Sequence, residues 1–499
     1  MSSSTVRIRM YCQGLGDCFL LTFPRSDAQH PVFHLLIDCG VIAGTEFARE
    51  KINAVVEDIF QTTKGHLDLV VGTHEHWDHL SGFNQARELF KQFSIDNVWL
   101  GWTEDPKDPK DLIKNRAAKV NALKKAVHQM ESGSAVSPGM AAQQSSIRQI
   151  LGFFGEEPGS DLGAAAGSPP TTRDAMDFLS KHAEAEVTYC YPSKPPMALE
   201  GVEGVRVYVF GPPEDPKYLK MSNPSKNAKT YGITAIGGED SFFAALSAPK
   251  DGTRYSDLRD LTFPFEEPFR IAFDEAERSE QAEFFEANYG FAKGDPQEWR
   301  RIEGDWLDVT SELALNLDSD TNNTSLVLAF ELGKPGSGQV LLFAADAQVG
   351  NWLSWKDLAW KIDAGGQTAL TQTAHQLLAR TVVYKVGHHG SHNATLSQLG
   401  LDLMTSENLI AMLPVDAGKA KDKGWDEMPF QPLLDTIAEK TQGRILRIDD
   451  PGLPLRPAGS HLNEKQWQQF IDALAMRSAK VPSVGEQKIY VEYLLTYEG

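Results

Sequence analysis

The pattern of apolar and polar positions predicts a sheet at the start of the chain. Residues 6–12 alternate between apolar and polar side chains, a Gly-Leu-Gly-Asp turn follows at 14–17, and residues 18–23 and 33–37 are apolar runs. Alternation and short apolar runs separated by turn residues are typical of consecutive β-hairpins. We therefore expect antiparallel strands before residue 40.

Helices and buried strands then alternate. Apolar residues recur at helical spacing over 46–61, and an apolar strand is predicted at 67–71. A helix at 82–92 and a strand at 97–101 continue the pattern. This alternation predicts an α/β fold, in which sites form at the carboxyl ends of strands.

The core pattern is interrupted twice. It returns at 205–210 and again from residue 322. The later strands are expected at 325–330, 340–344, 381–386, 409–413, 444–448 and 488–496, with helices at 352–362 or 367–379, 431–440 and 464–476. Structureless loops of about 100 residues are improbable inside a compact domain, so the intervening tracts should be folded insertions or lids. The predicted divisions are 1–101 (first half of the core), 102–200 (a helical, partly flexible insertion), 201–213 (a core strand), 214–320 (an acidic insertion or lid) and 321–499 (second half of the core with a C-terminal extension).

Composition narrows the classes of function. Lys and Arg number 48 against 68 Asp and Glu, a net charge of -20, which disfavours a protein whose whole surface binds nucleic acid or anionic membranes. Four cysteines without a Cys-x-x-Cys pair exclude a disulfide scaffold and a zinc ribbon. The chain lacks a signal-like apolar segment and a run of about 18 apolar residues. We expect a cytoplasmic protein without a membrane segment.

Four potential metal ligands follow the strand predicted at 67–71, namely His74, His76, Asp78 and His79. In an extended segment, positions i and i+2 point the same way, so His74 and His76 can share one ion. A turn would swing Asp78 and His79 towards a second ion. Imidazole with carboxylate suits zinc, manganese or iron at hydrolytic sites. The motif predicts a metal centre rather than a row of surface histidines.

A second histidine-rich segment supports this interpretation. His388 and His389 end another apolar strand, and Asp346 ends a third, where its carboxylate can bridge two ions. Alone, a histidine pair or a strand-end aspartate is a weak signal, since such an aspartate is usually a cap or turn residue. Together with the first motif, these residues become candidate ligands.

These motifs resemble those of the metallo-β-lactamase fold, an αββα sandwich that carries one or two metal ions. More narrowly, the chain is similar to the soluble hydrolase domain of bacterial competence DNA-uptake proteins. Besides the two histidine motifs and Asp346, the matching segments are 14–18, 36–40, 323–327 and 446–449. The resemblance covers roughly residues 5–100, 203–212 and 322–450, about half of the chain. It implies an αββα metallo-β-lactamase sandwich with two large insertions.

The resemblance also implies a cofactor and roles for named residues. The cofactor is Zn²⁺, as one or two ions, with Mn²⁺ as the alternative. The expected ligands are His74, His76, Asp78, His79, Asp346 and His388, and Asp38 would orient a ligand. The sequence leaves His388 and His389 open as alternatives. We choose His388 as the ligand because it directly follows the strand, which leaves His389 to protonate the leaving group and makes Asp78 and His389 the expected catalytic residues.

The chain departs from the family pattern at two places. The family often has a histidine after the strand equivalent to 205–210, and here Gly211 stands there. The first ion is therefore expected to lack a protein ligand and to bind more weakly. A substrate-side Gly-His-Pro is replaced by the segment 426–429. No membrane channel accompanies the domain, so DNA uptake is not implied.

The expected function is a metal-dependent hydrolase, and most specifically a phosphodiesterase or nuclease that uses a metal-activated water. The expected partner is a phosphodiester substrate, with DNA and RNA as candidates. A basic face predicted on a helix at 111–130 favours nucleic acid, as do the lysines of 419–423. The residues of that face are Lys114, Arg116, Lys119, Lys124 and Lys125. An ordinary solvated surface is the simpler interpretation of both features.

The alternative function is a partner-docking module of the same fold, with weak or partner-dependent activity. Its two insertions would bind other proteins or form a homodimer. Hydrolysis of esters or lactams is a further alternative, because a fold does not choose among such reactions.

Overall fold

The computed structural model describes most of the chain. The described residues are 3–108, 110–131, 147–155, 170–182, 185–221, 271, 273–292, 295–297, 300, 317–363, 370–393 and 395–498. Most of the stretch predicted to be partly flexible and most of the acidic insertion lie outside these residues.

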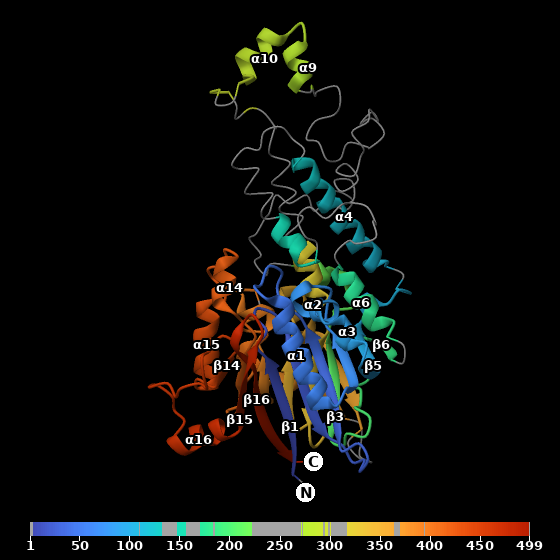
Figure 1. The fold of residues 1–499 in the computed structure, drawn as a ribbon, viewed down its shortest axis with the longest axis vertical. Helices are drawn as coiled ribbons and strands as arrows, with labels where there is room; N and C mark the ends of the chain where they lie inside the picture. The colour runs from blue at the N-terminus through green and yellow to red at the C-terminus, as the bar shows by residue number, and fades with distance from the viewer. Residues whose placement is uncertain are drawn as a thin grey trace.

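One half of the molecule is an eight-stranded sheet with the order β15-β16-β1-β2-β3-β4-β5-β6 (Figure 1). Its strands are β1 (Ser3–Tyr11), β2 (Cys18–Pro24), β3 (Val32–Cys39), β4 (His66–Gly72), β5 (Ser94–Gly101), β6 (Glu186–Cys190), β15 (Leu474–Val481) and β16 (Gly485–Glu498). The pairs β1–β2 and β2–β3 are antiparallel, which confirms the predicted hairpins, and β3 to β6 run parallel. The ligand motif thus follows a central parallel strand.

The other half is a six-stranded sheet with the order β14-β13-β12-β9-β8-β7. Its strands are β7 (Val205–Gly211), β8 (Val327–Leu332), β9 (Gln339–Phe343), β12 (Thr381–Lys385), β13 (Ile410–Leu413) and β14 (Ile445–Arg447), and β10 (Ala359–Ile362) pairs with β11 (Leu370–Thr373) outside it. Strands β9, β12, β13 and β14 are parallel, so the predicted metal residues after β9 and β12 emerge at one edge.

Alternating apolar side chains join the two sheets face to face. One buried cluster combines Ile8 and Phe19 of the first sheet with Phe330 and Phe343 of the second, and the rings of Phe19 and Phe343 are 5.4 Å apart. Two further clusters cover the outer faces, one against α1, α2 and α6 and the other against α12, α13 and α15. The chain is therefore a mixed α/β protein, with helices on both outer faces of two packed sheets.

The helices are short except for two. They are α1 (Ala48–Thr63), α2 (Trp77–Gln85), α3 (Arg87–Phe90), α4 (Leu112–Glu131), α6 (Thr172–Ser180), α7 (Pro216–Leu219), α9 (Phe273–Arg278), α10 (Ala282–Tyr289), α12 (Val349–Ser354), α13 (Ala374–Leu378), α14 (Ala417–Asp422), α15 (Gln431–Thr441) and α16 (Glu464–Asp472). Short 3-10 helices add η1 (Trp102–Glu104), η5 (Trp355–Asp357), η6 (Gly387–Gly390) and η7 (Leu401–Leu403). Within the described residues, each helix is too short or too polar to cross a membrane.

The two ends of the chain meet in the first sheet (Figure 1). Strand β16 pairs antiparallel with β1 from Ser3 opposite Glu498 to Tyr11 opposite Tyr490. The expected C-terminal extension therefore adds β15 and β16 to the sheet that the N-terminal residues begin.

The structure corrects three predicted boundaries. The helix expected at 464–476 ends at Asp472, because the following residues pair with β16, and this tertiary pairing overrides their helical propensity. The helix expected at 82–92 begins earlier, at Trp77 inside the ligand motif. Within the tract predicted as the first insertion, β6 pairs with β5 and extends the sheet.

Two glycines let the hairpin loops approach the ligand motif. A Cβ at Gly40 would lie 2.3 Å from the carbonyl carbon of Asp78, and one at Gly16 would lie 2.6 Å from the Asp78 oxygen. The Asp17 N–H donates to the same Asp78 oxygen over 2.9 Å. Backbone contact between these loops fixes where α2 begins.

We predict that Gly40→Ala destabilises the protein by about 1–3 kcal/mol, because its methyl group would overlap backbone atoms of Asp78 and His79. Urea unfolding of both variants is the measurement. The matched control is Gly459→Ala, whose methyl group would meet nothing within 4 Å. Equal unfolding midpoints for the two variants would contradict the prediction.

Candidate metal centre

The ligand motif spans the junction between β4 and α2. His74 and His76 lie on the loop after Gly72, whereas Asp78 and His79 lie on the first turn of α2. His76 has an extended backbone and ends the loop. The change from extended chain to helix is the turn that the sequence predicted. It directs the side chains of His74 and His76 to one position and those of Asp78 and His79 to a neighbouring one.

His74 and His76 form the first pair of candidate ligands. His74 Nε2 lies 3.1 Å from His76 Nδ1, and both side chains are buried. Two nitrogens that each bind zinc at about 2.0–2.1 Å in a tetrahedron lie roughly 3.3 Å apart. The observed separation therefore fits a shared ion.

A second group lies beside the first. Asp78 Oδ2 is 2.9 Å from His389 Nε2, and His79 Nε2 is 3.1 Å from Asp346 Oδ2. The separation between His389 Nε2 and Asp346 Oδ2 is 3.6 Å. Asp17 joins this group, since one ligand atom each of Asp17, His79, Asp346 and His389 lies within 4.8 Å of the others. The centroids of the His74 and His79 rings are 4.2 Å apart, so the two groups are neighbours.

The charge balance of this region favours a cation. Four buried carboxylates lie here, those of Asp17, Asp38, Asp78 and Asp346, and Lys385 pairs with Asp17 and lies 3.5 Å from Asp346. Asp17 Oδ1 and Asp78 Oδ1 are buried without a hydrogen-bond partner among the described residues. Burying unpaired anionic oxygens is costly, and a bound cation would offset that cost. The residues present therefore fit a metal ion.

The buried groups hold unusual protonation states. Burial disfavours the charged form of His79, but the carboxylates of Asp346, Asp17 and Asp38 outweigh it and raise the pKa of His79 well above its usual value. Burial alone dominates at His76 and lowers its pKa to about 3. His76 is thus a neutral imidazole, the form that binds metal, whereas His79 would release a proton when it binds an ion.

The structure separates the two histidines of the second motif. His389 Nδ1 lies 2.8 Å from the Pro414 carbonyl oxygen, which leaves Nε2 pointing into the second group. His388 is partly exposed, and its Nδ1 lies 2.7 Å from Ser391 Oγ. Both residues have a positive φ, a conformation that is uncommon outside glycine. Our choice of His388 as ligand therefore does not match the geometry, which brings His389 into the cluster instead.

Asp38 occupies the orienting position that the resemblance implied. Its carboxylate accepts the Thr73 N–H over 2.9 Å and the Thr73 hydroxyl over 2.6 Å, and it lies 2.7 Å from His79 Nδ1. This contact fixes Nδ1 of His79 on the outer side, so that Nε2 faces Asp346.

Sequence reasoning did not identify Asp17 or Lys385. Lys385 is fully buried at the end of β12, where its ammonium group pairs with Asp17, donates to the Ala345 carbonyl over 2.8 Å and lies 3.5 Å from Asp346. Asp17 lies in the glycine-rich turn just before β2. Its charge beside an apolar strand was the feature of the sequence that could have marked it as a candidate ligand. For Lys385, the corresponding feature was a charged residue at the end of an otherwise apolar strand.

Asp318 is another residue that the sequence did not single out. Its Oδ1 is 3.7 Å from His76 Nε2, and both atoms are buried without a hydrogen-bond partner among the described residues. Burial and the carboxylates of Asp78 and Asp346 raise the pKa of Asp318 to about 8. Because Nε2 lies on the far side of the ring from His74, Asp318 is placed to orient His76 rather than to share its ion.

Gly211 does not leave an open position for a histidine. A Cβ at this residue would lie 2.3 Å from Oδ1 of Asn351, whose amide group donates to the carbonyl oxygens of Asn323 and Ser325. The position beside Gly211 is therefore filled by the packed side chain of Asn351.

A buried ion-pair network lies beneath the motif and corrects the predicted basic face. Arg116 of α4 donates to Glu75 over 2.6 Å and to Glu104 over 2.9 Å, and Arg173 of α6 reaches the same two carboxylates. Arg116 is only 6% exposed, so it is unable to contact a nucleic acid. Lys119 lies 3.9 Å from Asp320, whereas Lys114 is exposed.

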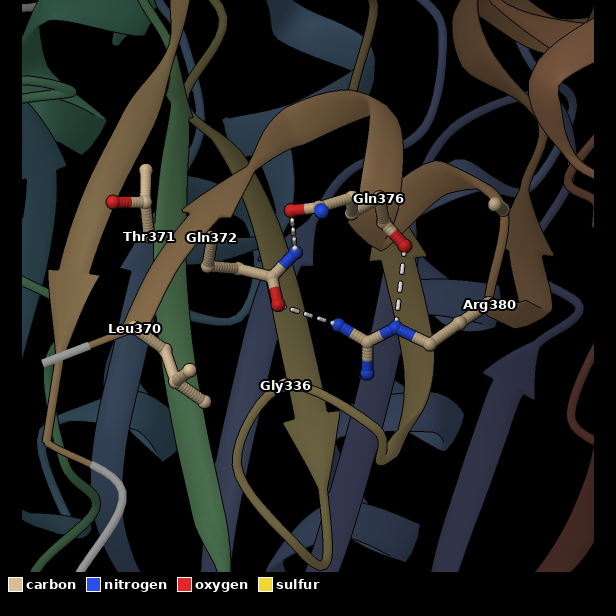
Figure 2. A pocket seen from close by; sticks show the side chains of 7 residues that line it. Gly336, Leu370, Thr371, Gln372, Gln376 and Arg380 are labelled. Carbon is tan, nitrogen blue, oxygen red and sulfur yellow. Dashed lines mark hydrogen bonds between the residues drawn. The ribbon is translucent and has the colours of Figure 1, made fainter. Parts of the chain in front are cut away.

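One other cluster of ligand-type residues and one other hollow are weaker candidates for a functional site. His66, Asp68 and Asp96 lie close together, but Asp68 already pairs with Arg25 over 2.7 Å. A hollow of about 410 Å³ lies beside β11 and α13. Figure 2 shows Arg380 at this hollow, hydrogen-bonded to Gln372. Arg380 also pairs with Glu331 over 2.7 Å, so its charge is balanced. At both places the charged groups already have partners, so the histidine cluster remains the stronger candidate for a metal site.

Comparisons with family models, with curated proteins and with solved structures found no match for this chain.

We predict that Arg116→Met destabilises the protein by about 3–5 kcal/mol, because Glu75 and Glu104 would stay buried without this partner. Urea unfolding measures the change. Lys114→Met is the matched control on the same helix, and its exposed pair with Asp111 contributes at most about 1 kcal/mol. A similar, small effect for both variants would contradict a structural role of the network.

We also predict that Asp318→Asn weakens zinc binding by about 10–100-fold, because the acidic group that lies 3.7 Å from Nε2 of His76 would be replaced by a neutral amide. Competition with a calibrated zinc chelator gives the affinity. Asp320→Asn, on the same turn but 3.9 Å from Lys119, should leave the affinity unchanged. The role of Asp318 is disproved if the two variants bind zinc equally well.

Proposed function

We propose that this protein is a metal-dependent hydrolase of the metallo-β-lactamase fold, that it binds one or two Zn²⁺ ions, with Mn²⁺ as the alternative, and that it cleaves phosphodiester bonds. The observation that carries the proposal is the pair of neighbouring ligand groups at one edge of two packed sheets. Paired ions suit displacement at phosphorus, because they hold both the attacking and the leaving oxygen.

The side-chain geometry supports the following ligand roles. His74 and His76 would hold the first ion, and Asp78, His79, Asp346 and His389 would hold the second. When bound, the metal supplies Lewis acidity and lowers the pKa of a coordinated water. Asp38 keeps His79 in the tautomer that presents Nε2, and the Pro414 carbonyl does the same for His389.

His388 is the better candidate for the proton donor. It is partly exposed, its Nδ1 is held by Ser391, and its backbone N–H donates to Asp346 Oδ1 over 3.1 Å. Its ring therefore lies beside the second group without belonging to it, and Nε2 is the nitrogen left to carry a proton to a leaving group. This arrangement reverses the roles that we first assigned to His388 and His389.

The partner-docking alternative has one observation in its favour. The rings of Phe153 and Phe154 lie 5.4 and 5.2 Å from that of His76, and the candidate ligands of both groups are almost fully buried. A substrate would have to displace residues of the first insertion to reach the ligands. A module whose activity depends on a partner would be closed in this way when alone.

We predict that His389→Ala and Asp78→Asn each lower the turnover of bis-(4-nitrophenyl) phosphate at least 100-fold and remove one bound zinc ion. His388→Ala should lower turnover while the zinc content stays at the wild-type value, because His388 is not a ligand. Metal analysis and a steady-state assay on the same preparations make the comparison.

The control is Asp402→Asn, which changes an exposed aspartate away from the centre. Loss of zinc in His388→Ala with full zinc in His389→Ala would show that the ligand roles are the reverse. A wild-type protein that holds zinc but turns over none of the esters, lactams and phosphodiesters tested would favour the docking module.

A further inference from the structure

A second hollow, of about 790 Å³, lies next to the metal centre. Its walls come from the loop after β3, the start of α1, the end of α2, residues 148–155 and the end of α14. These segments are far apart in the sequence, and the first insertion supplies one wall. The hollow is therefore a product of the fold that the sequence motifs did not reveal.

The lining of the hollow is basic in an acidic protein. Arg49, Arg148 and Lys423 contribute cationic groups, and the lining residues that the structure describes include no Asp or Glu. The chain as a whole carries a net charge of -20. Within the described residues, Arg49 and Lys423 have no acidic side chain at ion-pair distance. This local excess of positive charge attracts an anion.

Two lysines reinforce this excess. Burial and the nearby charge of Lys419 lower the pKa of Lys423. Lys419 donates to the Gly44 carbonyl over 2.6 Å, which holds it at the same loop. The repulsion between these ammonium groups is not relieved by a carboxylate of the hollow, and a bound phosphate would relieve it.

Aromatic and amide groups complete the lining. Trp77 and Trp425 are both lining residues, as are Asn84 and Gln85, and Gln85 Oε1 is buried without a hydrogen-bond partner among the described residues. Indole rings stack on bases of any sequence, and amide groups hydrogen-bond their edges. Cations with indoles and amides are the groups that recognise a nucleotide.

The hollow and the metal centre share a wall. Trp77 directly follows His76, and the backbone N–H of Trp77 donates to the Phe153 carbonyl over 2.6 Å. Phe153 stacks on Trp425 with the ring centroids 5.5 Å apart and also packs on the ring of His76. A molecule held in the hollow would thus lie against the residues that cover the candidate ligands.

We propose that this hollow binds one nucleotide unit of the substrate, with its phosphate on Arg49 and Lys423 and its base against Trp77 and Trp425. Its role as a substrate subsite rests on the proposed hydrolase function, whereas the binding of a nucleotide does not. The source of the nucleotide is either a free mononucleotide or a residue of a single strand.

The test measures binding directly, by the quenching of tryptophan fluorescence and by calorimetry, with AMP and with a 12-nucleotide single-stranded DNA as separate probes. The double variant Arg49→Gln, Lys423→Gln should weaken the binding of the recognised probe at least tenfold. For the strand, it should reduce the salt slope by about 0.7 for each phosphate contact removed. The control Lys421→Gln changes an exposed lysine of α14 that does not line the hollow.

The outcomes separate the two proposals. Binding of AMP assigns a mononucleotide, and binding of the strand alone assigns a nucleic-acid strand. The hollow is not a nucleotide site if neither probe binds, or if the double variant binds like the Lys421→Gln control. The hydrolase function fails on its own if Asp78→Asn and wild type turn over a small chromogenic phosphodiester equally, even though both bind the probe.

Discussion

The carboxylate of Asp38 is the contact on which the geometry of the centre depends. It is fully buried at the end of β3 and is bonded to the backbone and hydroxyl of Thr73 and to the ring of His79. These bonds tie β3 to the loop after β4 and select the nitrogen that His79 presents. Together with the backbone bond from Asp17 to Asp78, they hold the turn from β4 into α2 in place.

The centre also shows how a protein keeps many charges buried. Lys385 offsets Asp17 and Asp346 on one side, and Arg116 and Arg173 offset Glu75 and Glu104 on the other. Buried ions persist only when they are paired and hydrogen-bonded. Both arginines come from the segment predicted as the first insertion. This segment therefore stabilises the ligand loop through Glu75.

Much of the fold could be predicted because the strands are apolar and the turns carry glycine. The ligand motif was equally clear, since four ligand-type residues in six positions after an apolar strand are rare by chance. Asp17, Lys385 and Asp318 were not found, because each becomes a neighbour of the motif only through tertiary packing. Arg116 was misjudged for the same reason, since helical spacing does not show which side of an amphipathic helix a salt bridge will bury. Sequence alone did not show that His388 and His389 both have a positive φ, or that His389 rather than His388 lies in the buried cluster.

In the proposed centre, two metal positions share one edge of the packed sheets. Anomalous diffraction at the zinc absorption edge, from crystals grown with zinc, tests it most directly. One anomalous peak is expected between His74 Nε2 and His76 Nδ1, and a second among Asp78, His79, Asp346 and His389. Anomalous density only beside His66 and Asp96 would contradict the two-metal centre. The absence of anomalous density at His74, His76, His79 and His389 would also contradict it.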